Sequence, residues 1–284
     1  MNKIDTNLDR KSHLIENVYF YNTLPIFSIV EFNITELCNR KCSFCPRYDS
    51  SIYPNRDEHI SIDSYRKIMN DLKGIGYNGN VLYSAFGEPL LHPNLNELIR
   101  LTKEYCPNCH LEIITNGDFV TDDNIMDLFN NGLDTLLFSL YDGEHQIKQF
   151  QKLKDDNHLS DKQMQYRKRY ANEMILSNRA GLLPNIEKII KPKVLPCFYP
   201  FYQIIVDIDG TVTVCPHDWR KTPIMGNAVK ENIVDIWNNT KFRYIREKLI
   251  KDNRNFIPCS KCNVQGNLIG IRHFNAWVGY YGKT

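Results

Sequence analysis

The chain has 284 residues, enough for one large α/β domain or for a main domain with a small appendage. Its 35 basic and 33 acidic residues nearly balance, so composition does not point to nucleic acid or an acidic membrane as a partner. No apolar run approaches the roughly 20 residues that span a bilayer, and the N-terminus lacks the apolar core of a secretory signal. We therefore expect a cytoplasmic protein whose nine cysteines stay reduced and serve as metal ligands rather than disulfides.

Strand-like and helix-like segments alternate through the first half of the chain. Strands are predicted at 26–34, 80–86, 111–115 and 134–141, and helices at 60–77, 94–105 and 122–132. Ser61 is the predicted N-cap of the first of these helices. Such units form a parallel sheet, either open or closed into a full or partial barrel. Because chemistry gathers at the carboxyl edge of these sheets, we expect functional residues in the loops that follow the strands.

The second half of the chain has a different character. Residues 142–180 are polar and are predicted to be helical, and prolines become frequent from Pro184 onward. Asp209-Gly210 separates two alternating runs and predicts a β-hairpin, and a helix is predicted at 232–250. We expect an N-terminal extension at 1–25, an α/β partial barrel at 26–183 and a small C-terminal domain of hairpin and helix at 184–284.

Seven of the nine cysteines form two groups. Cys38, Cys42 and Cys45 follow the first predicted strand with the spacing C-x-x-x-C-x-x-C. Three thiolates are too few for a closed zinc site, but they can bind three irons of a 4Fe–4S cluster and leave the fourth iron open. The second group consists of Cys197, Cys215, Cys259 and Cys262. Taken alone, these four thiolates suit either a zinc ion or a 4Fe–4S cluster.

The remaining pair, Cys106 and Cys109, lies between a predicted helix and the strand that follows it. This position is at the amino edge of the expected sheet, away from the chemistry. A redox or metal-binding role is the alternative, but we predict that both are free structural thiols.

The first cysteine group, with Phe44 directly before its last member, resembles the motif of the radical S-adenosylmethionine (SAM) superfamily. The resemblance implies a 4Fe–4S cluster whose open iron binds the amino and carboxylate groups of SAM. Two later stretches agree with it, Gly87-Glu88-Pro89 and Thr115-Asn116-Gly117, and Ser139 ends the fourth predicted strand. The resemblance implies that the Gly-Glu stretch holds the methionine amino group and that the later positions contact the carboxylate and ribose of SAM.

Residues 184–284 resemble a twitch domain, a shortened SPASM domain that holds one auxiliary 4Fe–4S cluster on the second cysteine group. From about residue 28 to 265 the chain resembles the family of 2-deoxy-scyllo-inosamine dehydrogenases, in the stretches FGEPLL, ITNGDF, ILSNRAG and DIWNNTKF. This resemblance implies oxidation of a secondary alcohol to a ketone. SAM would supply the radical, and the auxiliary cluster would accept an electron.

Arg179, in LSNRAG, matches the position that contacts the substrate hydroxyl in that family, so we predict that it orients or deprotonates this group. The alternative is a helix-terminal arginine paired with carbonyls. Phe86 and Ile114 stand where the family has tyrosines that touch the substrate, and Pro216-His217 replaces a Phe-Glu pair. His217 is therefore a candidate substrate contact, although a lone histidine is more often structural. We expect a polyol, a sugar or a differently decorated aminocyclitol as substrate.

Other functions remain open at this point. An epimerase would need a free cysteine near the site, and a peptide maturase would need a leader-binding domain, for which the first 25 residues look too few. A zinc-ribbon binding module is the non-enzymatic alternative. The radical reaction implies an electron donor such as flavodoxin or ferredoxin as a partner.

Overall fold

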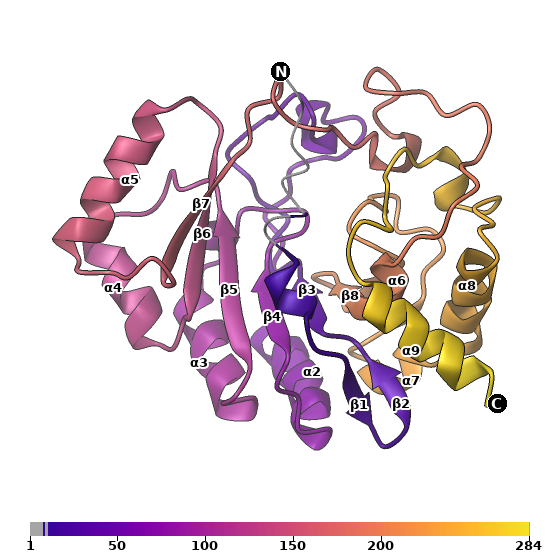
Figure 1. Ribbon diagram of the computed structural model, residues 1–284. Coiled ribbons are helices and arrows are strands. Elements are labelled where there is room, and N and C mark those ends of the chain that lie inside the picture. The colour runs from indigo at the N-terminus through magenta and orange to yellow at the C-terminus, as the bar shows by residue number, and fades with distance from the viewer. Residues whose placement is uncertain (1–7, 9–10, 284) are drawn as a thin grey trace.

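A computed structural model describes residue 8 and residues 11–283 (Figure 1). Within these residues, one mixed sheet has the strand order β10-β9-β8-β3-β4-β5-β6-β7, and a separate hairpin joins β1 (Tyr19–Tyr21) to β2 (Leu24–Ile26). The strands of the main sheet are β3 (Ile29–Phe32), β4 (Asn80–Tyr83), β5 (His110–Thr115), β6 (Thr135–Leu140), β7 (Met164–Lys168), β8 (Gln203–Val206), β9 (Thr211–Thr213) and β10 (Gly226–Asn227). In the part of the sheet with the order β8-β3-β4-β5-β6-β7, all neighbouring strands are parallel.

Helices cover the sheet in two groups. The first group is α2 (Ile62–Gly74), α3 (Leu95–Tyr105), α4 (Asp122–Asn130) and α5 (His145–Asp156). The second is α6 (Tyr199–Tyr202), α7 (Ile233–Trp237), α8 (Thr240–Ile250) and α9 (Ile271–Tyr281). The first group lies outside the parallel strands, and the second gathers beside β3 and β8 (Figure 1). None of the helices in the described part of the chain is long and apolar enough to cross a membrane.

The predicted α/β fold with a parallel sheet is confirmed. Strands β3, β4, β6 and β8 are buried along their whole length, as expected for strands covered on both faces. Strand β8 pairs with β3, with Ile29 opposite Gln203, so the sheet continues through the predicted boundary between residues 183 and 184. The division into segments 1–25, 26–183 and 184–284 therefore stays a prediction.

Local signals in the sequence account for several element ends. The Ser61 side chain caps α2 by accepting a hydrogen bond from the backbone N–H of Ser64 at 3.1 Å. The predicted hairpin joins β8 to β9, and Gly210 has φ +82° in its turn. A β-carbon on Gly210 would lie 2.6 Å from Val229, so this turn requires glycine.

Three predicted elements were wrong in part. The segment 142–180, predicted to be helical, contains the strand β7 after α5. Strand β7 is mostly half-buried because it lies at the edge of the sheet, and its sequence therefore need not be apolar. The predicted helix 232–250 is two helices, since Asn239 caps α8 by accepting from the N–H of Phe242. The predicted strand 26–34 is divided between β2 and β3. Helix α9 was not predicted.

A buried arginine holds the C-terminal helices together. Arg246 on α8 is 0% exposed, and its guanidinium carbon lies 3.6 Å from the ring centre of Trp277 and 4.0 Å from that of Trp237. It donates to the carbonyls of Pro200 and Trp237, each at 2.8 Å. Trp237 Nε1 in turn donates to the carbonyl of Pro25 at 3.1 Å. These contacts connect α6, α7, α8 and α9 to the hairpin of β1 and β2.

Replacing Arg246 with methionine should lower the free energy of unfolding by roughly 3 kcal/mol, because two buried carbonyls lose a charged donor. The measurement is chemical denaturation of the cluster-loaded protein. Arg243→Met is the matched control, because Arg243 lies on the exposed face of the same helix, where it pairs with Glu247 and lies over the Tyr281 ring. Equal unfolding midpoints for the two variants would contradict the role of Arg246.

Candidate active site

A chamber lies at the carboxyl edge of the parallel strands, and most of the predicted site residues line it. They are Cys38, Cys42, Phe44, Cys45, Phe86, Gly87, Glu88, Ile114, Thr115, Asn116, Ser139, Arg179 and His217. Pro89 and Gly117 belong to the same motifs but are not on this wall. The second cysteine group is also off the wall. The structure thus brings the loops after β3, β4, β5 and β6 together, as the sequence predicted.

The cysteine loop and the Gly-Glu motif are in direct backbone contact. The N–H of Glu88 donates to the carbonyl of Leu37 at 2.7 Å. A β-carbon on Gly87 would lie 2.0 Å from the carbonyl oxygen of Thr35, so only glycine allows this approach. Arg47, two residues after the last cysteine of the loop, is buried and donates from Nε to the carbonyl of Phe86. The two motifs are therefore held as one unit.

Glu88 joins that unit to the third motif. Its carboxylate accepts hydrogen bonds from the Thr115 hydroxyl at 2.7 Å, the Asn116 N–H at 2.8 Å and the Leu90 N–H at 3.2 Å. Burial raises the pKa of Glu88 to about 7, although these hydrogen bonds lower it. A buried carboxylate on the chamber wall suits a cationic ligand such as the amino group of SAM, because such a group would stabilise its charged form.

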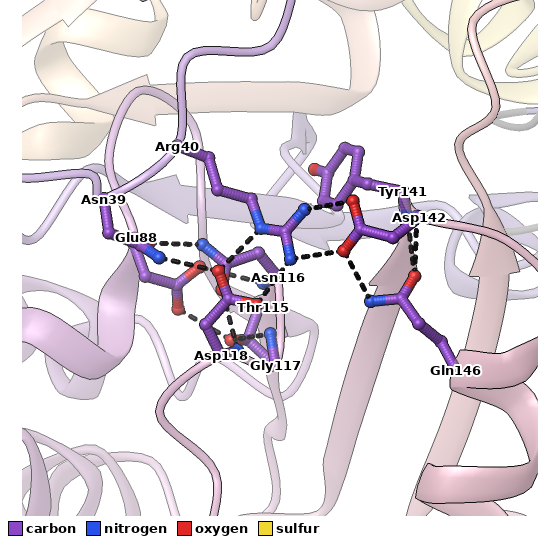
Figure 2. Close-up of polar contacts among 10 residues, drawn as sticks. All are labelled: Asn39, Arg40, Glu88, Thr115, Asn116, Gly117, Asp118, Tyr141, Asp142 and Gln146. Atoms are coloured by element: carbon purple, nitrogen blue, oxygen red, sulfur yellow. Dashed lines mark hydrogen bonds and ion pairs between the residues drawn. The ribbon is translucent and has the colours of Figure 1, made fainter.

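Arg40 clamps the cysteine loop to two further strand ends (Figure 2). Its guanidinium donates to both oxygens of Asp118, at 2.5 and 2.7 Å, and to both oxygens of Asp142, at 2.7 and 2.9 Å. It also lies 5.2 Å from the ring centre of Tyr141. Asn39 extends the clamp by donating to Asp118 at 2.6 Å. Since Asp118 follows β5 and Asp142 follows β6, one side chain fixes the loop across both strands.

The three thiols of this loop suit an iron–sulfur cluster with one open iron. Burial raises the pKa of Cys42 to about 12 and that of Cys38 above its usual value, and the negative charge of Cys45 raises both further. Neighbouring thiolates of this kind ionise together only if cations neutralise them, as bound iron does. All three thiols line the chamber, so a ligand of an open iron has access from it.

The second group consists of three buried cysteines, Cys215, Cys259 and Cys262, and the half-buried Cys197. Desolvation raises the pKa values of all four thiols, and the negative charge of Cys197 raises those of the other three further. Thiolates that bind a 4Fe–4S cluster each bind a different iron. A set of four cysteines, three of them buried and one half-buried, therefore suits such a cluster.

A buried arginine organises this second group. Arg254 donates to the carbonyls of Leu195 at 3.1 Å and Pro196 at 2.8 Å, just before Cys197. It also donates to the carbonyl of Val264 at 2.7 Å, two residues after Cys262. The same side chain thus joins the two segments that carry cysteines at opposite ends of the domain.

The Arg179 loop is strained and is fastened to the second cysteine group. Arg179 and the alanine after it have φ values of 50° and 53°, which non-glycine residues rarely adopt. Asn178, fully buried, donates from its side chain to the carbonyl of Lys261 at 2.8 Å. Its backbone N–H donates to the Asn263 side chain at 2.9 Å, and the Asn263 N–H donates back at 3.3 Å. Lys261 and Asn263 flank Cys262.

Arg179 Nε, His217 Nε2 and Trp219 Nε1 are buried polar atoms on the chamber wall with no hydrogen-bond partner among the described residues. An unpartnered buried polar group costs about 1–3 kcal/mol, so such groups mark a place for a ligand. Burial and then the charge of Arg179 lower the pKa of His217 well below its usual value, and its Nδ1 lies 2.9 Å from the Ser177 hydroxyl.

Several of these residues were missed in the sequence. Arg40 and Arg47 had a signal, since both are cations within or beside the cysteine motif. Arg254, Asn178 and Trp219 had none, because their partners come from distant parts of the chain.

The remaining cysteines lie elsewhere. Cys106 and Cys109 occupy the turn between α3 and β5, at the amino edge of the sheet, and are 2% and 3% exposed. Among the described residues, the cysteines on the chamber wall are those of the first group alone. Burial raises the pKa of Cys106 to about 11 and that of Cys109 to about 12, which makes both poor nucleophiles.

Comparison with known proteins identifies the family. Residues 32–169 match the Radical SAM superfamily, and residues 197–263 match SPASM, an iron-sulfur cluster-binding domain. The chain is also 31% identical over 241 residues to the S-adenosyl-L-methionine-dependent 2-deoxy-scyllo-inosamine dehydrogenase of Niallia circulans, a match that covers 84% of this chain and 93% of that protein. The chain belongs to the radical SAM superfamily. It is therefore an enzyme that uses SAM and a 4Fe–4S cluster, and its SPASM domain carries an auxiliary iron–sulfur cluster. The zinc-ribbon binding module considered from the sequence is wrong.

Solved structures of the superfamily agree. BtrN in complex with AdoMet and 2-DOIA matches with a TM-score of 0.72 and 28% identity, over 84% of this chain and 94% of that one. BtrN in an open conformation matches with a TM-score of 0.64 and 25% identity, over 84% and 93%. The radical SAM enzyme described here is thus more similar in shape to the ligand-bound form of BtrN than to the open form.

Replacing Arg40 with methionine should increase the rate of iron release from the first cluster about tenfold. The reason is that replacing a residue that orients metal ligands typically lowers metal affinity by 10- to 100-fold. The measurement is the rate of iron release to a chelator under anaerobic conditions. Lys41→Met is the matched control, since Lys41 is the neighbouring, exposed cation. Equal release rates would show that the clamp is dispensable.

Iron content should separate the two cysteine groups. Replacing Cys38, Cys42 and Cys45 together with alanine should leave about four irons per chain, as should replacing Cys259 and Cys262. The unaltered protein and a Cys106→Ala, Cys109→Ala control should each hold about eight. A loss of iron in the control would overturn the assignment of that pair as structural.

Proposed function

We propose that this protein is a radical SAM dehydrogenase that oxidises a secondary alcohol of a polyol, sugar or aminocyclitol to a ketone. The observation that carries the proposal is the position of Arg179. Its unpartnered Nε lies on the wall of the chamber that the first cysteine group faces, while its loop is fastened to residues beside Cys262. A substrate hydroxyl at Arg179 would therefore lie between the two cysteine groups.

The assignments of the cofactor ligands follow the same geometry. Cys38, Cys42 and Cys45 hold the SAM-binding cluster, and the second group holds the auxiliary cluster. Glu88 binds the amino group of SAM, and Ser139 with Asn116 contacts its remaining polar groups. Bound in this way, SAM and the reduced first cluster supply the radical that removes a hydrogen atom, and the auxiliary cluster supplies an electron acceptor.

Arg179 acts on the substrate hydroxyl. Its Nε–H donates to the hydroxyl oxygen and stabilises the negative charge left there when the hydroxyl proton passes to solvent. The carbinol carbon becomes a ketone once it has also lost its hydrogen atom to the SAM-derived radical and one electron to the auxiliary cluster. Burial lowers the pKa of Arg179, and yet the side chain stays protonated at neutral pH, because the usual pKa of arginine is above 12. It therefore orients the hydroxyl as a hydrogen-bond donor rather than as a strong base.

Aromatic side chains keep water from this point. Trp219 packs edge-on against Phe86 and Tyr53, with ring centres 4.8 Å apart in both pairs. Phe86 and Trp219 both line the chamber. A dry wall protects a carbon radical from side reactions and strengthens the contact between Arg179 and the hydroxyl.

Epimerisation, the alternative within the superfamily, requires a thiol that returns a hydrogen atom to the substrate. The cysteines that line the chamber in the described residues are the three cluster ligands, and Cys106 and Cys109 lie at the opposite edge of the sheet. Dehydrogenation is therefore the function that this site supports best. The proposal also includes a small electron-transfer protein as the donor, and a reducing compartment such as the cytoplasm, where seven ligand thiols stay reduced.

The test uses anaerobically reconstituted enzyme with SAM, a limiting reductant and a panel of aminocyclitols, sugars and sugar nucleotides. One compound should yield 5'-deoxyadenosine and a product two mass units lighter in equal amounts. Formation of 5'-deoxyadenosine without mass loss, together with deuterium uptake at carbon in heavy water, would instead indicate a redox-neutral reaction.

With that substrate, Arg179→Met should lower kcat/KM by about a hundredfold or more, because a charged donor to the reacting oxygen is lost. Arg179→Lys should restore part of the rate, since it keeps the charge but not the geometry. Iron content and SAM affinity should not change in either variant. An unchanged rate in Arg179→Met would remove Arg179 from the mechanism.

A further inference from the structure

A second cavity lies beside the chamber. Its free volume is ≈ 600 Å³, compared with ≈ 170 Å³ in the chamber. The rest of its wall comes from residues 43, 174–177, 185–187, 193 and 263–265. The two spaces meet at five side chains that line both, namely Phe44, Arg169, Arg179, Tyr199 and His217.

The two volumes limit where a substrate fits. The chamber is the smaller of the two spaces, and it has to admit SAM as well as the reacting carbon. The second cavity has the size of an ordinary small-molecule site, which is about 300–1,000 Å³. Any group attached to the reacting ring on the Arg179 side would therefore lie in the second cavity.

The second cavity is lined by more positive than negative charge. Arg169, Arg179 and Lys193 face it, and Glu187 is the carboxylate on its described wall. Glu187 already accepts a hydrogen bond from the Asn263 side chain at 3.0 Å. Lys193 donates one bond, to the Asn263 carbonyl at 2.6 Å, and an ammonium group has three donors. In a partly enclosed space this excess of cations attracts an anion.

Hydrogen-bonding groups at the junction also lack partners. Arg179 Nε and His217 Nε2 are buried and unpartnered among the described residues, and His217 is 5% exposed. The Ser177 hydroxyl already accepts from the N–H of Arg179 at 3.1 Å, and in the tautomer in which it donates to His217 Nδ1, the neutral imidazole donates from Nε2. The junction of the two cavities thus offers hydrogen-bond donors. An anionic oxygen can accept these hydrogen bonds, whereas an ammonium group is itself only a donor.

We propose that the substrate is a polyol or sugar joined to an anionic group, either a phosphate or a carboxylate, and that this group binds in the second cavity to Arg169, Lys193 and His217. The inference rests on the proposed function, since it places the reacting ring at Arg179. It narrows the substrate class to anions and disfavours free, cationic aminocyclitols.

The charge of Lys193 also reaches Cys262, whose pKa it lowers. An alternative role for Lys193 is to stabilise the auxiliary cluster without contacting the substrate. In that case, replacing Lys193 changes the cluster but leaves the preference for anionic ligands unchanged. The two roles are therefore distinguished by measuring which ligands bind.

The experiment is anaerobic calorimetry on the holoenzyme with SAM, at constant ionic strength. The probes are glucose 1-phosphate, UDP-glucose and glucuronate, compared with glucose and glucosamine. At least one anion should bind about tenfold more tightly than glucose, and glucosamine should bind most weakly. Comparison of the phosphates with glucuronate distinguishes the two kinds of anion.

Lys193→Met should weaken binding of that anion by about tenfold and leave SAM affinity unchanged. Lys191→Met is the matched control, because Lys191 is an exposed lysine two residues away and lines neither cavity. The proposal is overturned if no anion binds at millimolar concentration, if glucosamine binds as well as the anions, or if both variants bind alike. Because binding is measured without turnover, a failure of the dehydrogenase proposal would appear separately, in the product assay.

Discussion

The contact between the backbone of Gly87 and the carbonyl of Thr35 is the constraint on which the site depends. A single methyl group would not fit between them, and the next residue, Glu88, uses its N–H on the cysteine loop and its carboxylate on the end of β5. The loops after β3, β4 and β5 are thus joined through Gly87 and Glu88. The Arg40 clamp then adds the end of β6, so the cysteine loop is fixed from both sides.

The auxiliary half of the molecule is fixed to this frame in a different way. Asn178 and Asn263 exchange hydrogen bonds in a buried position, and this pair holds both the strained Arg179 backbone and a residue next to Cys262. The proposed substrate contact, Arg179, and the segment that carries Cys262 are therefore parts of one arrangement. Such preorganisation is what a reaction needs when a hydroxyl has to be held between two cofactors.

The sequence was informative where function depends on short-range spacing. The cysteine motif, the Gly-Glu stretch and the strand ends follow from local patterns, because parallel strands bring their carboxyl ends to one edge. It was uninformative where partners come from distant segments. The edge strand β7 has a polar sequence that local pattern does not distinguish from helix, and the break at Asn239 is a capping preference that competes with helical periodicity. Arg254 and the second cavity depend on tertiary contacts alone.

The pairing of β8 with β3 has a consequence for how the chain folds. Ile29 lies beside Gln203, so β3 cannot pair with β8, its second neighbour in the sheet, until most of the chain has been synthesised. Contacts of such high sequence separation slow folding, and until β8 is made, β3 presents an open edge that can pair with another chain. During synthesis, the segment that ends in the first cysteine loop would thus need protection until the auxiliary half emerges from the ribosome.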